Sequence, residues 1–439
     1  MDERSVVTVF LTDAGEVLLL RRSEEVGSYA GRWGGVAGHV EPGQTPLQAA
    51  HTEITEETGL SPEAVSLVAQ GEPFTVSDAD LDVRWRVHPF RFETASREVE
   101  PNWETAELRW VSPPEIRELP TVPDLWTSWD RVRPTVAAVE QNTTDGSATL
   151  SRRALEVLRD EAALLASEDG DWDSLSAVAS ELKAARAAMA VVQVRVDRAM
   201  SEASAARTPE AVQKAAAAGI ERALAADRQA AAEAASRIED RTVFTVSRSG
   251  TVERALLTGA PAAVRVAVSR PGGEGRDLAN SLAAAGHDVT LLGDANVPLG
   301  VSQAEAVLVG ADTVLPDGDV INKAGTTAAA LAANRQGVPV YVTCATAKIS
   351  PTDDGFLDHS AGDLDADPGV TALDPPFERT PADLVDGILT EDGVLDQAEV
   401  AEVAAEHAAL AAWEQSLSRP NPNGVWGDSD DELPPPSPL

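Results

Sequence analysis

The chain has 439 residues, and 72 acidic against 35 basic residues give it a formal net charge of −37. Such a surface repels nucleic acid and anionic membranes, so we expect neither direct nucleic-acid binding nor a membrane partner. Hydrophobic residues still make up 43% of the chain, which excludes a wholly disordered protein and, at this length, predicts two or three folded domains.

The excess of acidic residues also predicts a salt-rich environment. Like charges at this density oppose compaction, and molar salt limits their reach to about 3 Å, so we expect a halophilic protein. Cys344 is the single cysteine, residues 1–4 carry charge in place of an apolar segment, and no long uninterrupted apolar run occurs. These features predict a reducing cytoplasmic location, no signal peptide and no membrane-spanning helix.

Residues 1–135 combine short β-rich runs with one strongly signalled helix, which predicts an α/β domain. The β-like runs cover residues 6–11, 17–20, 83–92 and 108–111. A turn at residues 13–15 separates the first two runs. The polar, flexible stretch at residues 142–147 lies within a linker that we assign to residues 136–149.

Residues 150–237 are rich in alanine and apolar at helical spacing, which predicts a small helical bundle. Breaks fall at residues 168–170 and 208–210. At the second break Thr208 suits the helix cap and Pro209 the first turn.

From residue 238 the pattern changes to strands alternating with helices, which predicts a doubly wound parallel sheet, a Rossmann-like domain, over residues 238–413. The expected strands are residues 264–268, 289–292, 306–309 and 338–342, and the expected helices are residues 276–285, 325–334 and 397–413. Cys344 is expected to lie on a late strand and is predicted to be a buried core residue. Residues 414–439 are acidic and rich in proline, which predicts a disordered tail.

Three glutamates in the N-terminal domain form the first candidate site. Glu53, Glu56 and Glu57 stand at i, i+3 and i+4, so they project from one face of a helix that Gly59 would end in a left-handed cap. Three crowded carboxylates repel one another unless a hard cation lies between them, and Mg²⁺ or Mn²⁺ meets that need. Such an ion neutralises a diphosphate and positions an attacking water. The alternative is a solvated acidic face, which is common in a chain of this charge.

The segment around these glutamates resembles the Nudix box. The motif positions are occupied by Gly38, Glu53, Ile54, Glu56, Glu57, Gly59 and Leu60. The resemblance implies a Nudix α/β/α sandwich that cleaves the pyrophosphate of a nucleoside diphosphate linked to another group. It also implies that the three glutamates are catalytic metal ligands and that Gly38 contacts the substrate, a nucleotide-linked small molecule.

Two positions depart from the Nudix pattern. Gln44 stands where the motif has glutamate, and Thr52 where it has arginine. The two losses together leave no isolated charge, which favours a compensated active site over an inactive binding module. The general base stays open between Glu98, Glu104 and Glu107, each of which has surface charge as its alternative role.

The C-terminal half carries a candidate phosphate site. Arg270 and Arg276 lie in a glycine-rich loop after an expected strand, and Asn322 and Lys323 precede an expected helix. In an open α/β sheet ligands bind beyond the carboxyl ends of the strands, where helix N-termini offer free N–H groups. Lys323 is one of four lysines in the chain, which favours a retained contact with an anion. The alternative is that these residues only form turns.

Asp312 lies in the sequence Gly-Ala-Asp. Together with the motifs above, it makes residues 150–413 resemble the family of initiation factor 2B alpha, beta and delta subunits, ribose-1,5-bisphosphate isomerase and methylthioribose-1-phosphate isomerase. The resemblance is to the haloarchaeal type of this family. The resemblance implies a sugar-phosphate ligand and a homodimer. It also implies an isomerase pair of cysteine and aspartate. Asp312 matches the aspartate, whereas Ser247 stands where the cysteine would lie, and a hydroxyl exchanges protons poorly compared with a thiol of pKa about 8.5.

The sequence thus favours a magnesium-dependent Nudix hydrolase fused to a domain that binds sugar phosphates or nucleotides. A non-catalytic metabolite sensor or translation-factor-like assembly protein is the first alternative. A ribose-1,5-bisphosphate-type isomerase that uses Asp312 is the second.

Overall fold

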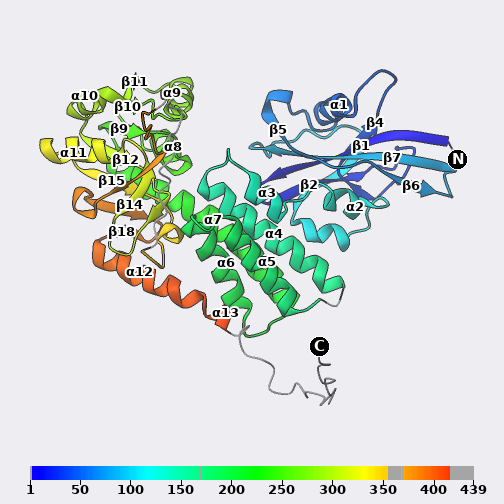
Figure 1. The fold of residues 1–439 in the computed structure, drawn as a ribbon. Coiled ribbons are helices and arrows are strands. Elements are labelled where there is room, and N and C mark those ends of the chain that lie inside the picture. The colour runs from blue at the N-terminus through cyan, green and yellow to red at the C-terminus, as the bar shows by residue number, and fades with distance from the viewer. Residues whose placement is uncertain (1, 169, 354–366, 368, 416–439) are drawn as a thin grey trace, which may run out of the picture.

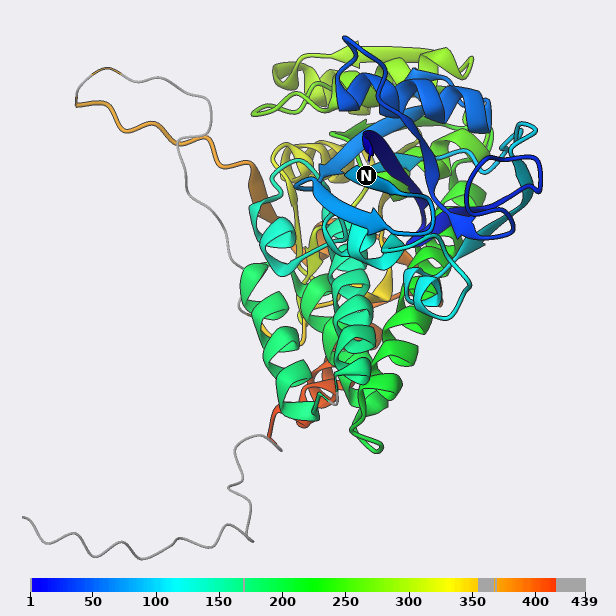
Figure 2. The same ribbon diagram turned by 90° about the vertical axis from the view of Figure 1, so that its right-hand side faces the viewer.

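The computed structural model describes residues 2–168, 170–353, 367 and 369–415, and it has three parts in chain order. A sheet domain at the N-terminus and a second sheet domain toward the C-terminus lie on either side of a helical block (Figure 1). Figure 2 views the molecule from the side of the N-terminal domain, with the helices below it and the second sheet domain behind. The predicted tail lies outside the described residues from residue 416 onward.

The N-terminal domain is built on an eight-stranded sheet with the order β3-β2-β1-β7-β5, to which β4, β6 and β8 are added beside β1, β7 and β2. Strands β1 and β7 pair in parallel, and the other neighbours pair antiparallel. Its elements are β1 (Asp2–Asp13), β2 (Glu16–Arg22), β3 (Trp33–Gly34), β4 (Val36–His39), α1 (Pro46–Thr58), η1 (Pro62–Ala64), β5 (Val65–Gln70), β6 (Phe74–Asp78), β7 (Val83–Thr94), β8 (Thr105–Val111), η2 (Pro113–Arg117) and α2 (Leu125–Asp130).

Both faces of this sheet are covered, because its strands alternate apolar side chains between two cores. Val9 and Leu11 of β1 pack with Ile54 of α1 on one face. Phe10, between them in sequence, packs with Trp129 of α2 on the other. The arrangement confirms the predicted α/β/α sandwich and fixes α1 on the sheet.

The helical block follows the predicted alanine-rich region. Its elements are α3 (Val136–Gln141), α4 (Ser147–Ser167), α5 (Trp172–Ala185), α6 (Ala190–Ala203) and α7 (Pro209–Ile238). Thr208 caps α7 by accepting a hydrogen bond from the backbone N–H of Ala211, and Pro209 begins its first turn, as predicted. The C-terminal end of α7 packs into the second sheet domain through Ala231, Ala234 and Ile238, so one continuous helix joins the two parts.

The C-terminal domain contains a seven-stranded sheet with the order β11-β10-β9-β12-β15-β17-β18, in which only β18 is antiparallel. Numbered within the domain, the six parallel strands run 3-2-1-4-5-6, so the strand order reverses between β9 and β12. A small antiparallel sheet, β13-β14-β16, lies beside it. The elements are β9 (Thr242–Val246), α8 (Gly250–Thr258), β10 (Ala263–Ala267), α9 (Gly275–Ala284), β11 (Val289–Leu292), η3 (Asp294–Asn296), α10 (Val297–Ser302), β12 (Ala306–Val309), β13 (Thr313–Val314), β14 (Val320–Lys323), α11 (Thr326–Gln336), β15 (Val340–Thr343), η4 (Thr346–Lys348), β16 (Phe377–Thr380), η5 (Ala382–Leu384), β17 (Gly387–Thr390), β18 (Gly393–Leu395), α12 (Gln397–Leu410) and α13 (Ala412–Gln415).

Helices cover both faces of this sheet, which confirms the predicted doubly wound domain. Helices α7, α8 and α9 pack on one face, and α10, α11 and α12 pack on the other. Each strand expected from the sequence overlaps an observed strand, with ends displaced by at most two residues in this domain. None of the helices in the described part of the chain is long and apolar enough to cross a bilayer.

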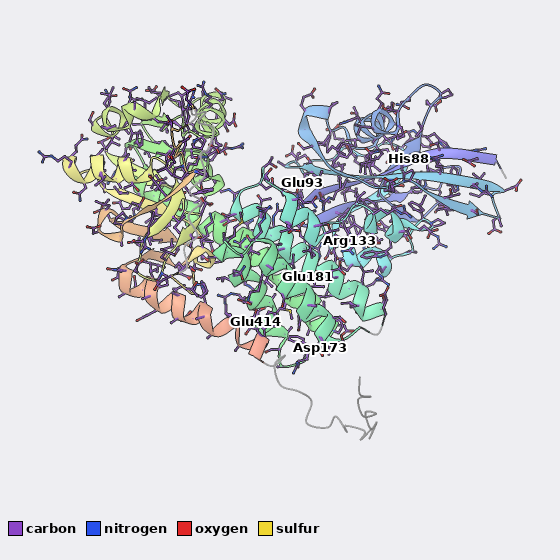
Figure 3. The ribbon with its side chains drawn as sticks, in the orientation of Figure 1. His88, Glu93, Arg133, Asp173, Glu181 and Glu414 are labelled. Atoms are coloured by element: carbon purple, nitrogen blue, oxygen red, sulfur yellow. The ribbon has the colours of Figure 1, made fainter. Side chains whose placement is uncertain are left out.

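Helix α4 joins the N-terminal domain to the rest of the molecule through polar contacts along its length. Arg159 donates from Nη1 to the backbone oxygen of Gly15 at 2.7 Å, and Arg153 forms an ion pair with Glu93. Farther along, Arg133 pairs with Glu161 at 2.9 Å. Glu93 and Arg133, both labelled in Figure 3, lie where the N-terminal domain meets α4.

Candidate functional site

Helix α1 presents the glutamates of the N-terminal site, and local signals set both of its ends. Thr45 and Gln48 form a capping box at the start of the helix. Gly59 ends it with φ 71°, which confirms the predicted left-handed cap. Between these ends Glu57 is buried, Glu53 is half-buried and Glu56 is exposed.

Strand β4 makes room for one of these side chains. A Cβ atom at Gly38 would lie 1.7 Å from Oε1 of Glu53, so the absent side chain of Gly38 is the space that the Glu53 carboxylate occupies. Gly38 pairs with Val7 of β1, so the rigid sheet fixes this space. The expected contact between Gly38 and substrate stays a prediction.

Burial and mutual repulsion shift the protonation of this cluster. The pKa of Glu57 is raised to about 8, first by burial and then by the charges of Glu53 and Glu104, against the opposing effects of Arg22 and of a hydrogen bond from the N–H of Ala37. The pKa of Glu53 is likewise raised to about 7 by burial together with the charges of Glu56, Glu104 and Glu41. The charges that raise these two pKa values all belong to carboxylates around one space.

Of the three candidates for the general base, Glu104 is the one whose charge acts on both Glu53 and Glu57. Glu107 points elsewhere, because it pairs with Arg109 at 2.7 Å and with Arg21 at 3.1 Å. The hydrogen bond from Arg109 lowers the pKa of Glu107, which makes it a poor proton acceptor.

The two departures from the Nudix pattern contact each other. Nε2 of Gln44 donates to Oγ1 of Thr52 at 3.3 Å. Oε1 of Gln44 accepts from the N–H of Glu41 at 3.2 Å, and the Thr52 hydroxyl donates to the backbone oxygen of Gln48 at 3.0 Å. A neutral pair therefore occupies the place of the charged pair in the motif and still ties the loop to α1.

A divalent cation fits the chemistry of this cluster. Within the described residues no three His, Cys, Asp or Glu side chains are already gathered closely enough to hold one ion. The carboxylates of Glu53, Glu56, Glu57 and Glu104 nevertheless supply the oxygen donors that a hard cation prefers. The raised pKa values of Glu53 and Glu57 reflect burial and repulsion between carboxylates, and a cation would relieve that repulsion.

A cavity of about 790 Å³ forms the candidate site of the C-terminal half. It lies beyond the carboxyl ends of β9 and β12, where the strand order reverses, which is where ligands bind in open α/β sheets. Asp312, Asn322, Lys323 and Ser247 all line it, so the structure brings these four sequence candidates together. Lys348 also lines it, which places two of the four lysines of the chain in one cavity.

Contacts within this cavity hold its polar side chains. Nζ of Lys323 lies 2.7 Å from Oε1 of Glu274. The lysine that was expected to bind phosphate therefore forms an ion pair with a carboxylate of the same chain. The amide of Asn322 donates to the Thr326 hydroxyl at 3.0 Å. Asp312 accepts a hydrogen bond from the hydroxyl of Ser147, the first residue of α4, at 3.2 Å.

Ser247 lies at the tip of β9 in a left-handed backbone conformation with φ 59°. Its N–H donates to the Ser269 hydroxyl at 2.6 Å, and the residue is buried beside the cavity. Cys344 is fully buried, and burial raises its pKa to about 12, which confirms the predicted core position and removes it as a nucleophile.

The structure separates the predicted phosphate-binding residues into two groups. Arg270 and Arg276 line a smaller cavity of about 190 Å³ together with Asp374, whereas Asn322 and Lys323 line the larger one. The loop that carries the two arginines turns Glu274 toward Lys323. Glu274 lines the larger cavity, so this loop borders both, and the binding of a phosphate by all four residues stays a prediction.

The arginines that line the large cavity were missed by the sequence analysis, and two of them lie within helices of the helical block. Arg152 of α4 and Arg195 of α6 line it, and Arg195 donates to the hydroxyl of Ser151 at 2.7 Å. Both lie within helices, where an arginine carries no local signal of ligand binding. The predicted linker also contributes, because residues 143–146 line the cavity just ahead of α4.

Comparison with known proteins matches both halves. Residues 143–397 match the initiation factor 2 subunit family, and residues 2–131 match the NUDIX domain. Ribose 1,5-bisphosphate isomerase of Archaeoglobus fulgidus is 38% identical over 136 residues, which is 29% of this chain and 44% of that protein. The probable bifunctional methylthioribose-1-phosphate isomerase/methylthioribulose-1-phosphate dehydratase of Nocardia farcinica is 38% identical over 168 residues, which is 35% of this chain and 30% of that protein.

Among solved structures, translation initiation factor eIF-2B of Pyrococcus horikoshii matches with a TM-score of 0.52 and 27% identity, over 59% of this chain and 94% of that chain. The chain spans less than half the length of the two curated relatives.

Proposed function

The chain belongs to the initiation factor 2 subunit family and carries a NUDIX domain ahead of that region, and from this premise we propose that its N-terminal domain is a metal-dependent hydrolase. The substrate is a nucleoside diphosphate linked to another group, and water cleaves its pyrophosphate. The C-terminal cavity binds a phosphorylated sugar.

The crowded glutamates of α1 are the observation that carries the hydrolase proposal. Glu53, Glu56 and Glu57 would hold Mg²⁺ or Mn²⁺, with Glu53 seated in the space left by Gly38. The bound ion supplies charge neutralisation to the diphosphate and acidity to the attacking water. Ala37 orients the Glu57 carboxylate by hydrogen bonding.

Glu104 takes the role of proton acceptor in this proposal. Its charge acts on Glu53 and Glu57, so it belongs to the same cluster, and this supports the assignment of Glu104 as the group that receives the proton of the attacking water. The neutral contact between Gln44 and Thr52 supports an active site because it keeps the loop joined to α1.

A turnover screen tests the hydrolase proposal. Full-length protein with Mg²⁺ is incubated with nucleotide sugars and dinucleoside polyphosphates in high salt, and release of phosphate esters is measured. Glu57→Gln and Glu104→Gln should each lower kcat by about 100-fold or more, because proton transfer and metal binding are impaired. Glu63→Gln, a fully exposed glutamate on η1, should keep the wild-type rate. No release from any compound, or wild-type turnover by Glu57→Gln, would refute the proposal.

The phosphosugar proposal for the C-terminal cavity rests on Lys323 and Lys348 beside Asp312 and on relatives named for ribose 1,5-bisphosphate and methylthioribose 1-phosphate. Ser247 in place of the expected cysteine favours binding without turnover. Calorimetry with ribose 1,5-bisphosphate in EDTA should detect binding that Lys323→Gln abolishes. Conversion of the compound, seen by NMR and lost in Asp312→Asn, would instead establish the isomerase alternative.

The homodimer, the halophilic character and the sensor alternative stay predictions. Sedimentation at several salt concentrations measures the oligomeric state and its dependence on salt. A change of assembly size with nucleotide, in the absence of turnover, would favour the sensor over the hydrolase.

A further inference from the structure

The N-terminal domain contributes to the wall of the C-terminal cavity. Asp13 and Ala14, in the turn between β1 and β2, line the same cavity as Asp312 and Lys323. The rest of the wall comes from the start of α4, from α6 and α7, and from loops of the second sheet domain. The cavity is therefore shared between the two halves of the chain.

The turn that reaches the cavity is fixed from both sides. Within its own domain, Nε of Arg97 bonds Oδ2 of Asp13 at 2.6 Å. From the helical block, Arg159 donates to the backbone oxygen of Gly15 at 2.7 Å. Gly15 has φ 83°, and a Cβ there would lie 3.1 Å from Ile220, so this glycine allows the turn to seat closely on α7.

Helix α4 runs from the side of the cavity that holds Asp312 to the turn that holds Gly15. Ser147 contacts Asp312 at the start of the helix. Arg152, another lining residue, follows five residues later, or about 7.5 Å along the axis at 1.5 Å per residue. The next turn of α4 carries Glu156, which borders Gly15. A phosphate ion is shorter than the separation of Ser147 and Arg152 along the helix axis, whereas a phosphorylated pentose extends over more of it.

From this geometry we infer that Asp13 and Ala14 are ligand-contacting residues of the C-terminal cavity, and that Asp13 selects ligands which present hydroxyl groups to it. The inference rests on the proposed phosphosugar binding. Arg97 occupies Oδ2 of Asp13, and among the described residues Oδ1 has no hydrogen-bond partner, so it is available to accept from a sugar hydroxyl.

Calorimetry on the full chain in EDTA and high salt tests the inference, with ribose 5-phosphate and inorganic phosphate as the probes. Asp13→Asn should weaken ribose 5-phosphate binding about tenfold, as expected for one hydrogen bond to a charged group, and leave inorganic phosphate binding unchanged. Ala14→Phe should weaken ribose 5-phosphate binding at least as much, because the ring enters the cavity. Asp80→Asn and Ala79→Phe, exposed residues of the turn between β6 and β7, are the matched controls and should bind as the wild type does.

The outcomes separate this inference from the proposal beneath it. Wild-type binding by both Asp13→Asn and Ala14→Phe, together with loss of binding in Lys323→Gln, overturns the inference and keeps the phosphosugar proposal. If Asp13→Asn weakens the binding of inorganic phosphate and of ribose 5-phosphate equally, the inference is also overturned. Asp13 would then affect the structure of the cavity and not contact a sugar hydroxyl. Absence of ribose 5-phosphate binding in the wild type refutes the phosphosugar proposal and the inference together.

Discussion

Replacing Gly38 with alanine should disable the hydrolase without unfolding it. A Cβ at this position would lie 1.7 Å from Oε1 of Glu53 and 1.9 Å from its Cδ. The carboxylate must therefore retreat by about 1.7 Å to reach the 3.4 Å of an ordinary contact. A misplacement of 1 Å in a catalytic group costs about 100-fold in rate, so kcat/KM should fall by at least about 100-fold. Gly38 is not in the left-handed region, so alanine is compatible with the strand.

The assay compares kcat/KM at saturating Mg²⁺ with the thermal midpoint measured by circular dichroism. Gly27→Ala is the matched control, because a Cβ there has no neighbour within 4 Å, and it should retain the wild-type rate. In a Glu53→Ala background the same Gly38→Ala change should have no further effect on rate, since the clash is gone.

A Gly38→Ala protein that folds and hydrolyses at the wild-type rate would show that the position of Glu53 does not matter for turnover. An equal further loss in the Glu53→Ala background would show that Gly38 acts through something other than Glu53. Either result refutes the reasoning.

Three further predictions concern charge. Metal-free protein should lose thermal stability as the pH rises from about 5 to 9, because the folded state keeps protons on Glu53 and Glu57, whose pKa values are about 7 and about 8, while the unfolded chain releases them. Saturating Mg²⁺ should remove this loss of stability. A thermal midpoint that does not change with pH in the metal-free protein would contradict the prediction. Glu274→Gln should tighten inorganic phosphate binding roughly two- to fivefold by calorimetry, because Lys323 loses a competing carboxylate, and weaker binding would contradict this. Glu156→Leu should lower the free energy of unfolding by about 3–5 kcal/mol, because the arginines around Glu156 lose a buried charged partner. Denaturant titration measures this free energy, and an unchanged value would refute the prediction.

Elements with strong local signals could be predicted from the sequence. Helix α1 has a cap at Thr45 and a glycine at its end, and β12 lies at the residues expected from its apolar run. The short strands β13 and β14 and the helix α8 were not anticipated. Segments of two to nine residues have too few positions to show a period, and pairing with distant strands stabilises them.

The C-terminal site was predicted in part. Asn322 and Lys323 are adjacent in sequence, and the structure keeps them in one cavity. Arg270 and Arg276 were predicted from a glycine-rich loop after a strand, and in the structure they line a smaller cavity. The direction of side chains in an irregular loop depends on the surrounding packing, which the sequence pattern does not encode.

The sequence by itself determined that Glu53, Glu56 and Glu57 share a helical face, because residues three and four apart on a helix are neighbours whatever surrounds them. Only the tertiary structure decided that Gly38 leaves space for Glu53 and that Asp13 borders the cavity of Asp312. Those contacts join strands, turns and helices that are distant in the chain. Their geometry arises from how the sheets and α4 pack together, so no local spacing of residues announces it.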